Sequence, residues 1–163
     1  MREEKSDLCA SKGAGGNESI NRKWMLMRIN TKAKGTAAER ELVHLFWKNG
    51  WAALRSAGSG AIRYPVPDIV AANNIRKVAV ECKTVNDSVY IDRKEIEDLK
   101  TFAKVFGAEG WVGLRFGQES GQGKWFFLGV EELKATKTGF TANLELCQMK
   151  GLLFEQLIKS KHF

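Results

Sequence analysis

The most constraining feature of this sequence is the stretch "DIVAANNIRKVAVECKTV", residues 68–85. Two runs rich in Val, Ile and Ala flank Asn73 and Asn74, and this pattern is typical of a β-hairpin. Glu81 and Lys83 interrupt the second run, and the alternation of side chains along a strand puts both of them on one face. The stretch therefore predicts a hairpin with two charged groups on the same face.

Asp68 begins the first run and can join this charged face. A turn of two or of four residues places Asp68 opposite position 79 or 81, on the face of Glu81, whereas a three-residue turn does not. Two carboxylates about 4 Å apart repel by roughly 4 kcal/mol at an effective dielectric near 20. A divalent cation converts this repulsion into attraction, and Mg²⁺ accepts carboxylates, a backbone carbonyl, water and substrate phosphate. The hairpin therefore predicts a metal site, beside which Lys83 would orient the attacking water and balance charge on a phosphate.

A solvated hairpin face that carries Asp, Glu and Lys is the common alternative to such a site. The Pro-Asp and Glu-x-Lys patterns each occur by chance in many proteins. Glu39 favours the metal site, because it leads the apolar stripe of a helix predicted within "KGTAAERELVHLFWKNG", residues 34–50. The expected N-cap of this helix is Thr36, with Glu39 as the acid of a capping box and Gly50 at the C-terminal end.

The remaining segments alternate between strand and helix patterns. We expect strands over 51–57, 111–116 and 124–130 and a Gly-rich loop over 58–67. A helix begins with the capping box of Asp92 and Glu95 and ends at Gly107, and its apolar stripe is Ile96, Leu99, Ala103 and Phe106. A C-terminal helix begins at residue 151, and its apolar residues are Leu152, Leu153, Leu157 and Ile158. The order helix, three strands, helix, two strands, helix predicts an α/β fold with a mixed central β-sheet flanked by helices.

Charge and composition favour a phosphate-bearing partner. The chain of 163 residues has 26 Lys and Arg against 19 Asp and Glu, and residues 31–163 keep 20 basic against 15 acidic side chains, which leaves +5 of the total +7. A basic domain attracts nucleic-acid backbones. Residues 1–30 are polar and contain "SKGAGG", which predicts a flexible extension before one domain over 31–163.

Other features exclude several classes of protein. No apolar run approaches the roughly 18 residues of a membrane span, and the N-terminus lacks signal-peptide features, so we expect a cytoplasmic protein without membrane contact. The cysteines Cys9, Cys82 and Cys147 have no spacing typical of a disulfide framework or a zinc site. Along the predicted strand, Cys82 points away from the charged face.

Several phrases of the sequence resemble a known family. Pro67, Asp68, Glu81 and Lys83 fit the PD-(D/E)xK nuclease motif, and "KGTAAERELV", "LRSAGS", "PDIVA" and "KATKTGF" are similar to phrases of the archaeal Holliday junction resolvases, in the same order over residues 32–159. The resemblance implies a restriction-endonuclease-like core and a homodimeric endonuclease that depends on Mg²⁺, with Mn²⁺ as a substitute. It implies resolution of four-way DNA junctions by paired phosphodiester hydrolysis in recombination and repair, in a nucleoid-associated protein that meets recombination or replication proteins.

The resemblance also implies roles for individual residues. The catalytic set is Glu39, Asp68, Glu81 and Lys83; the metal ligands are Glu39, Asp68, Glu81 and the backbone carbonyl of Cys82; and the DNA-contacting residues are Arg40, Arg55, Ser56, Ser59, Arg63 and Tyr64. For single residues of the Gly-rich loop, a plain connector is the alternative to a DNA contact. Cys82 departs from the family, which usually has an apolar residue at this position.

Two other functions remain open from the sequence. One is a PD-(D/E)xK repair or restriction-like nuclease that acts on another DNA structure, and the other is a DNA-binding module without catalysis. The aromatic side chains of the late strands are expected in the core, and exposed ones would be candidates for a dimer interface: Trp111, Phe116, Trp125, Phe126 and Phe127.

Overall fold

A computed structural model of the chain describes residues 35–56, 63–117 and 123–160. The expected extension over residues 1–30 and the predicted contact Ser59 lie outside these ranges.

The described residues form short helices and strands in the predicted order, with several additions. A helix covers residues 35–48, and the later elements are β1 (Ala52–Arg55), β2 (Ile69–Ala72), β3 (Lys77–Val85), β4 (Ser88–Asp92), α2 (Arg93–Phe106), β5 (Glu109–Phe116), β6 (Lys124–Gly129), β7 (Lys134–Ala135), β8 (Gly139–Asn143), α3 (Leu144–Lys150), β9 (Leu152–Leu153) and α4 (Phe154–Lys159).

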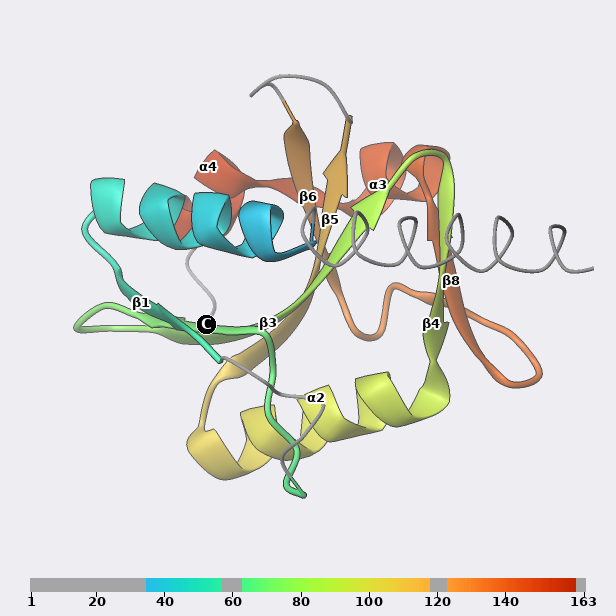
Figure 1. The fold of residues 1–163 in the computed structure, drawn as a ribbon, viewed down its shortest axis with the longest axis horizontal. Coiled ribbons are helices and arrows are strands. Elements are labelled where there is room, and N and C mark those ends of the chain that lie inside the picture. Colours follow the sequence, from blue (N-terminus) through green and yellow to red (C-terminus); the bar gives the residue numbers. More distant parts are fainter. Residues whose placement is uncertain (1–34, 57–62, 118–122, 161–163) are drawn as a thin grey trace, which may run out of the picture. The chain divides into compact units, whose positions relative to one another are not determined.

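Within the described ranges, six strands form a mixed sheet in the order β1-β2-β3-β5-β6-β9. β3 and β5 are parallel, and the other neighbours are antiparallel. The chain between β3 and β5 passes through β4 and α2, as a parallel pair requires. β4, β8 and β7 form a second, three-stranded antiparallel sheet. Figure 1 shows the helix at 35–48 and α2 on opposite sides of the larger sheet.

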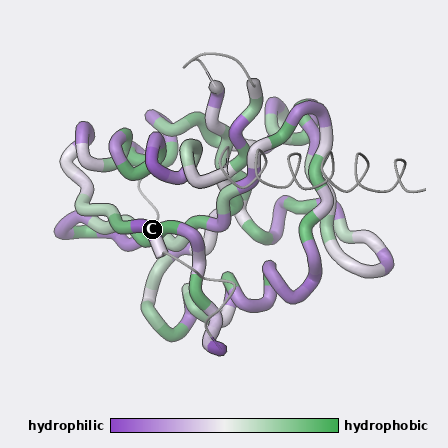
Figure 2. The backbone as a smooth tube through the Cα atoms, in the orientation of Figure 1, coloured by the Kyte–Doolittle hydropathy of each residue, from purple (hydrophilic) through white to green (hydrophobic). Residues whose placement is uncertain are grey.

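Alternation along the strands divides the core into two clusters, one on each face of the larger sheet. On one face, Ala79 of β3 and Val112 of β5 pack with Ile96 and Leu99 of α2, and we name this cluster the α2 core. On the other face, Val78 and Val80 of β3 pack with the helix at 35–48 and with α4, and we name this cluster the opposite core. Figure 2 shows hydrophobic segments along the central strands and hydrophilic segments along much of α2.

The structure confirms the predicted caps of α2. Asp92 and Glu95 form its capping box, and Gly107 ends it with φ +68°. The apolar stripe is shorter than expected, because Ile96, Leu99 and Ala103 are buried whereas Phe106 is 44% exposed.

Other local predictions are wrong. Thr36 is not an N-cap, because residues 35 and 36 are already helical, although Gly50 does follow the helix with φ +76°. Leu152 and Leu153 do not begin the last helix; they form β9, whose backbone pairs with β6. The three-stranded sheet and α3 had no counterpart in the predicted order.

The late-strand aromatic residues belong to the core. Five of them are at most 8% exposed and belong to the two clusters: Trp111, Phe116, Trp125, Phe126 and Phe127. None of these five is therefore an exposed candidate for a dimer interface. None of the helices that the structure describes has the length and apolar character needed to cross a bilayer.

Candidate active site

The register of the β2–β3 hairpin brings Asp68 opposite Glu81. Ile69 pairs with Val80, so the preceding residue of β2 faces the following residue of β3. The hairpin turns through four residues, since Ala72 pairs with Lys77, and this is one of the two registers that the sequence allowed. The predicted convergence of the two carboxylates on one face is confirmed.

Asp68 extends the β2–β3 ladder with its side chain. β2 begins at Ile69, and the Asp68 carboxylate accepts a hydrogen bond from the Cys82 N–H, 2.8 Å from Oδ2. The Asp68 backbone carbonyl accepts a hydrogen bond from the Ser56 N–H at 2.8 Å, next to the end of β1. Asp68 is thus held by β3 through its carboxylate and by the end of β1 through its backbone carbonyl. The Cys82 side chain packs against the opposite core, as predicted.

Lys83 lies between two carboxylates from different elements. Its Nζ is 3.0 Å from Oε1 of Glu81, which is two residues earlier on β3, and 2.6 Å from Oε1 of Glu95 in the first turn of α2. The side chains of Lys83 and Glu81 are 23% and 14% exposed, so both ions are largely withdrawn from water.

Burial and mutual repulsion make the two carboxylates of the hairpin hard to ionise. Burial, followed by the negative charge of Asp68, raises the pKa of Glu81 to about 7 although Lys83 opposes the shift. Burial also raises the pKa of Asp68, while the hydrogen bond from Cys82 lowers it and the charge of Glu39 raises it further. For Lys83, burial alone would lower the pKa, but Glu81 and Glu95 outweigh burial and raise it above the usual 10.5. The hairpin carries concentrated negative charge beside one ammonium group.

Glu39 lies on the other face of the sheet, near enough to Asp68 for its charge to raise the pKa of that carboxyl. It lies on the helix at 35–48, whose residues Leu42 and Phe46 are buried in the opposite core. Its Oε2 forms an ion pair of 2.8 Å with Nη1 of Arg55, the last residue of β1. The two predicted residues therefore contact each other, and Arg55 is a direct partner of a predicted catalytic acid.

As the side chains lie, no three His, Cys, Asp or Glu groups in the described residues converge closely enough to hold a metal ion. The ion pairs explain this arrangement, because Glu39 points to Arg55 and Glu81 to Lys83.

Among the residues that the structure describes, the other predicted DNA-contacting residues make no side-chain contact with these charged groups. Arg40, Arg63 and Tyr64 are exposed to solvent, and Ser56 is half-buried and contacts Asp68 through its backbone.

Glu95 is the site residue that sequence reasoning missed. The sequence pattern Asp92-x-x-Glu95 predicts only helix capping, and both capping bonds are present. The ion pair with Lys83 depends on how α2 packs against β3, and no local pattern records that packing. The signal available in the sequence was an acid at the start of the helix that follows the Glu-x-Lys strand.

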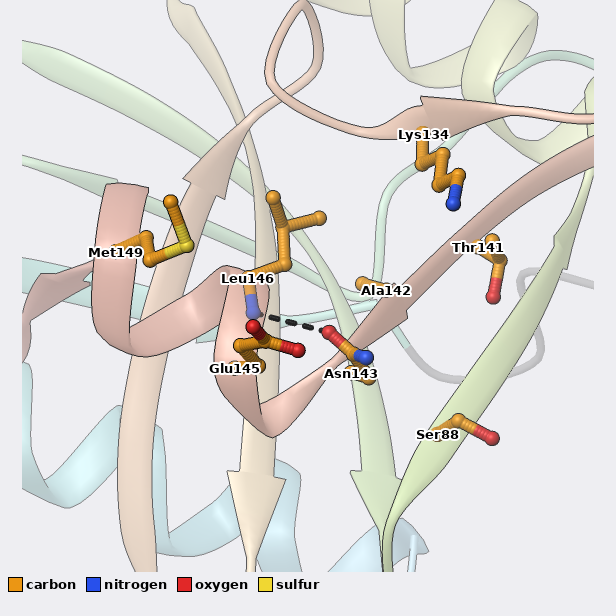
Figure 3. Close-up of a pocket in the computed structure, with 8 residues that line it drawn as sticks. All are labelled: Ser88, Lys134, Thr141, Ala142, Asn143, Glu145, Leu146 and Met149. Atoms are coloured by element: carbon orange, nitrogen blue, oxygen red, sulfur yellow. Dashed lines mark hydrogen bonds between the residues drawn. The ribbon is translucent and has the colours of Figure 1, made fainter.

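The structure also contains a pocket of about 280 Å³ away from these charged groups. It lies between the second sheet and α3, and its lining residues are Ser88, Lys134, Thr141, Ala142, Asn143, Glu145, Leu146 and Met149 (Figure 3). None of the predicted site residues lines it. Asn143 uses its side chain there to cap α3 through the Leu146 N–H, which is a structural role.

Comparisons with known proteins identify the family. The family model described as archaeal Holliday junction resolvase (Hjc) matches residues 30–162. The crossover junction endodeoxyribonuclease Hjc of Archaeoglobus fulgidus is 38% identical over 138 residues, which cover 80% of this chain and 98% of the relative. The protein of the same name from Sulfolobus acidocaldarius is 30% identical over 135 residues, which cover 80% and 90%.

A solved structure agrees with the sequence comparisons. The Holliday junction resolvase Hjc of Archaeoglobus fulgidus matches with a TM-score of 0.68 and 36% identity, over 76% of this chain and 98% of that one. The mixed sheet and its helices are therefore the PD-(D/E)xK fold that the sequence predicted. This chain belongs to the archaeal Holliday junction resolvase family.

Proposed function

We propose that this protein is a Mg²⁺-dependent endonuclease that resolves four-way DNA junctions by paired hydrolysis of phosphodiester bonds. One observation carries the proposal: the β2–β3 hairpin of a resolvase-family chain brings Asp68, Glu81 and Lys83 onto one face. A non-catalytic DNA-binding module has no use for two carboxylates with pKa values raised by burial. Membership of the resolvase family disfavours a restriction-like nuclease that acts on other DNA.

The donor set suits a hard divalent cation. Asp68 and Glu81 offer carboxylate oxygens. The Cys82 carbonyl belongs to the residue of β3 whose backbone N–H donates to the Asp68 carboxylate. Asp68 contacts Cys82 through Oδ2 and Glu81 contacts Lys83 through Oε1, so each carboxylate has its other oxygen for a cation. Glu39 would join this set, in exchange for its contact with Arg55, as a further ligand. Mn²⁺, with the same preference for oxygen donors, is a substitute.

The residues divide the work of hydrolysis between them. Asp68 and Glu81 would hold Mg²⁺, which would polarise the phosphoryl oxygen and lower the pKa of bound water. Lys83, fixed by Glu81 and Glu95, donates hydrogen bonds toward the attacking water or a phosphate oxygen and balances the negative charge that develops on the phosphate oxygens. Binding of the DNA backbone, which the net charge of +7 favours, involves six further residues: Arg40, Arg55, Ser56, Ser59, Arg63 and Tyr64.

The test separates binding from cleavage. Four proteins are each mixed separately with a four-way junction, a Y-fork and a linear duplex of matched sequence. They are the parent and the variants Asp68→Asn, Glu81→Gln and Lys83→Ala. In EDTA all four should bind the junction within about twofold, because Lys and Arg supply the affinity. With Mg²⁺ only the parent should make paired, symmetric nicks in the junction, and extra Mg²⁺ should not restore Lys83→Ala.

Glu97→Gln is the matched control, because it removes one charge from an exposed position of α2. It should cut like the parent. Equal cutting of all three DNAs would contradict junction specificity. Cleavage by Asp68→Asn and Glu81→Gln within a few fold of the parent would contradict the metal site.

We also propose that the protein acts as a homodimer, because paired nicks on opposing strands need two sites and the proposed site occurs once per chain. With the late-strand aromatics buried, we take the exposed apolar side chains at the end of α2 as the interface to test: Val105 is 84% exposed and Phe106 is 44% exposed. Light scattering at micromolar concentration should give twice the chain mass of 18.2 kDa, and Val105→Glu should lower it. An 18.2 kDa species alone for the parent would refute the dimer.

A further inference from the structure

The amine of Lys83 has an anchor outside the strand that carries it. The distance from its Nζ to Glu95 Oε1 is 2.6 Å, shorter than the 3.0 Å to Glu81 Oε1. Glu81 belongs to the same strand, whereas Glu95 belongs to α2, which packs its Ile96 and Leu99 into the α2 core. α2, which is held in place by the α2 core, is therefore in direct contact with Lys83 of the hairpin.

Lys83 needs such an anchor, because a lysine side chain is a flexible four-carbon stem with about 2 kcal/mol of rotamer entropy. An ammonium group that must meet a developing charge works best when its position is fixed in advance. In the proposed function Glu81 has a second task, because its other oxygen would hold the cation, whereas Glu95 has no part in holding the cation. Glu95 can keep its contact with Lys83 while Glu81 serves the cation.

The carboxylate of Glu95 is itself held in place by the first turn of α2. Its Oε2 accepts a hydrogen bond of 3.1 Å from the backbone N–H of Asp92, while Oε1 faces Lys83. The two oxygens thus have different partners, one in the helix cap and one in the site. The capping box fixes the direction in which Glu95 presents its charge.

We propose that Glu95 is a positioning residue for junction cleavage: it holds the Lys83 ammonium toward the scissile phosphate and is oriented for this task by the hydrogen bond from the Asp92 backbone N–H. The inference rests on the proposed function and adds a residue to its site.

The chain offers a pair of variants that separates this role from helix capping. Glu95→Gln keeps the capping box, because the Gln carbonyl oxygen can accept from the Asp92 N–H, but it removes the charge that holds Lys83. Asp92→Ala removes the side chain that accepts from the Lys94 N–H at 2.9 Å, yet it keeps the backbone N–H that orients Glu95. Glu97→Gln removes one charge from an exposed position of the same helix.

Single-turnover cleavage of a four-way junction at saturating protein and Mg²⁺ measures the step in which Lys83 acts. Glu95→Gln should lower this rate at least tenfold, with junction binding in EDTA within twofold of the parent and an unchanged melting temperature. Asp92→Ala should melt about 3 °C lower, as expected for a lost N-cap, and cut within threefold of the parent. Glu97→Gln should match the parent in all three measurements.

The outcomes are distinguishable. A parent that fails to cut the junction refutes the proposed function. A parent that cuts, with Glu95→Gln within threefold of it, overturns the positioning role alone. An equal loss in Asp92→Ala and Glu95→Gln assigns the effect to the helix cap, and a tenfold loss of junction binding by Glu95→Gln assigns it to DNA affinity; either result also overturns the positioning role.

Discussion

Replacing Glu81 with Gln should stabilise the metal-free protein although it abolishes cleavage. Burial and the charge of Asp68 raise the pKa of Glu81 from 4.5 to about 7 despite its ion pair with Lys83. At neutral pH the folded protein therefore ionises this carboxyl at a cost in free energy that the unfolded chain does not bear. Gln preserves the size of the side chain without the charge. Lys83 keeps a partner in the variant, because Glu95 remains 2.6 Å from its Nζ.

The pH dependence of this effect has a definite sign. A raised carboxyl pKa means that the folded protein binds more protons than the unfolded chain between pH 4.5 and about 7, so the stability of the parent falls as pH rises through this interval. Gln does not titrate, and the variant lacks this fall. At 1.36 kcal/mol per pH unit, the advantage of the variant should grow by about 2 kcal/mol between pH 5 and pH 8.

Urea unfolding in EDTA, followed by tryptophan fluorescence, measures this difference. Parent and Glu81→Gln are compared at pH 5 and pH 8 and at one protein concentration, because association would shift both curves. Glu97→Gln is the control and should show no comparable change relative to the parent. If the difference between Glu81→Gln and the parent stays constant within about 0.5 kcal/mol from pH 5 to pH 8, the carboxylate is not destabilised by its surroundings and the electrostatic account of the site is wrong.

Two further predictions test the fold and its boundaries. Gly113→Ala should lower the free energy of unfolding by about 1–3 kcal/mol, because its Cβ would lie 2.9 Å from Val80 Cγ1 and 3.3 Å from the Phe127 ring; an unchanged urea midpoint would contradict this packing. Removal of residues 1–26 should leave junction cleavage within tenfold of the full chain, about 1.4 kcal/mol on the barrier, because the family match begins at residue 30; a larger loss in the cleavage rate would assign these residues to the site or its DNA track.

The hairpin and α2 could be predicted because their determinants are local. Strand alternation fixes the shared face of Glu81 and Lys83, and only the length of the turn remained open. Asn73 closes the four-residue turn, since its Oδ1 accepts from the backbone N–H groups of Ile75 and Arg76. Likewise, the two ends of α2 depend on its own capping residues.

The parts that could not be predicted depend on contacts between distant segments. The second sheet joins Ser88 to Asn143 and consists of strands of two to five residues, too short for a clear pattern. Leu152 and Leu153 have an apolar pattern that suits either a helix or a strand, and pairing with Phe126 and Phe127 decides for the strand. The sequence pattern at Thr36 is compatible with an N-cap, but it does not prevent residues 35 and 36 from being helical.

The orientation of the positively charged side chains of the site, Arg55 and Lys83, depends on both cores of the protein. Glu39 is carried by the helix in the opposite core and pairs with Arg55, whereas Glu95 is carried by α2 in the α2 core and pairs with Lys83. The strands position the backbones of Arg55 and Lys83, and these two acids, with Glu81 as a further partner of Lys83, orient their long side chains. The strand motif therefore identifies the charged residues Asp68, Glu81 and Lys83 of the site. The packing of one helix on each face of the sheet adds the acids that orient Arg55 and Lys83.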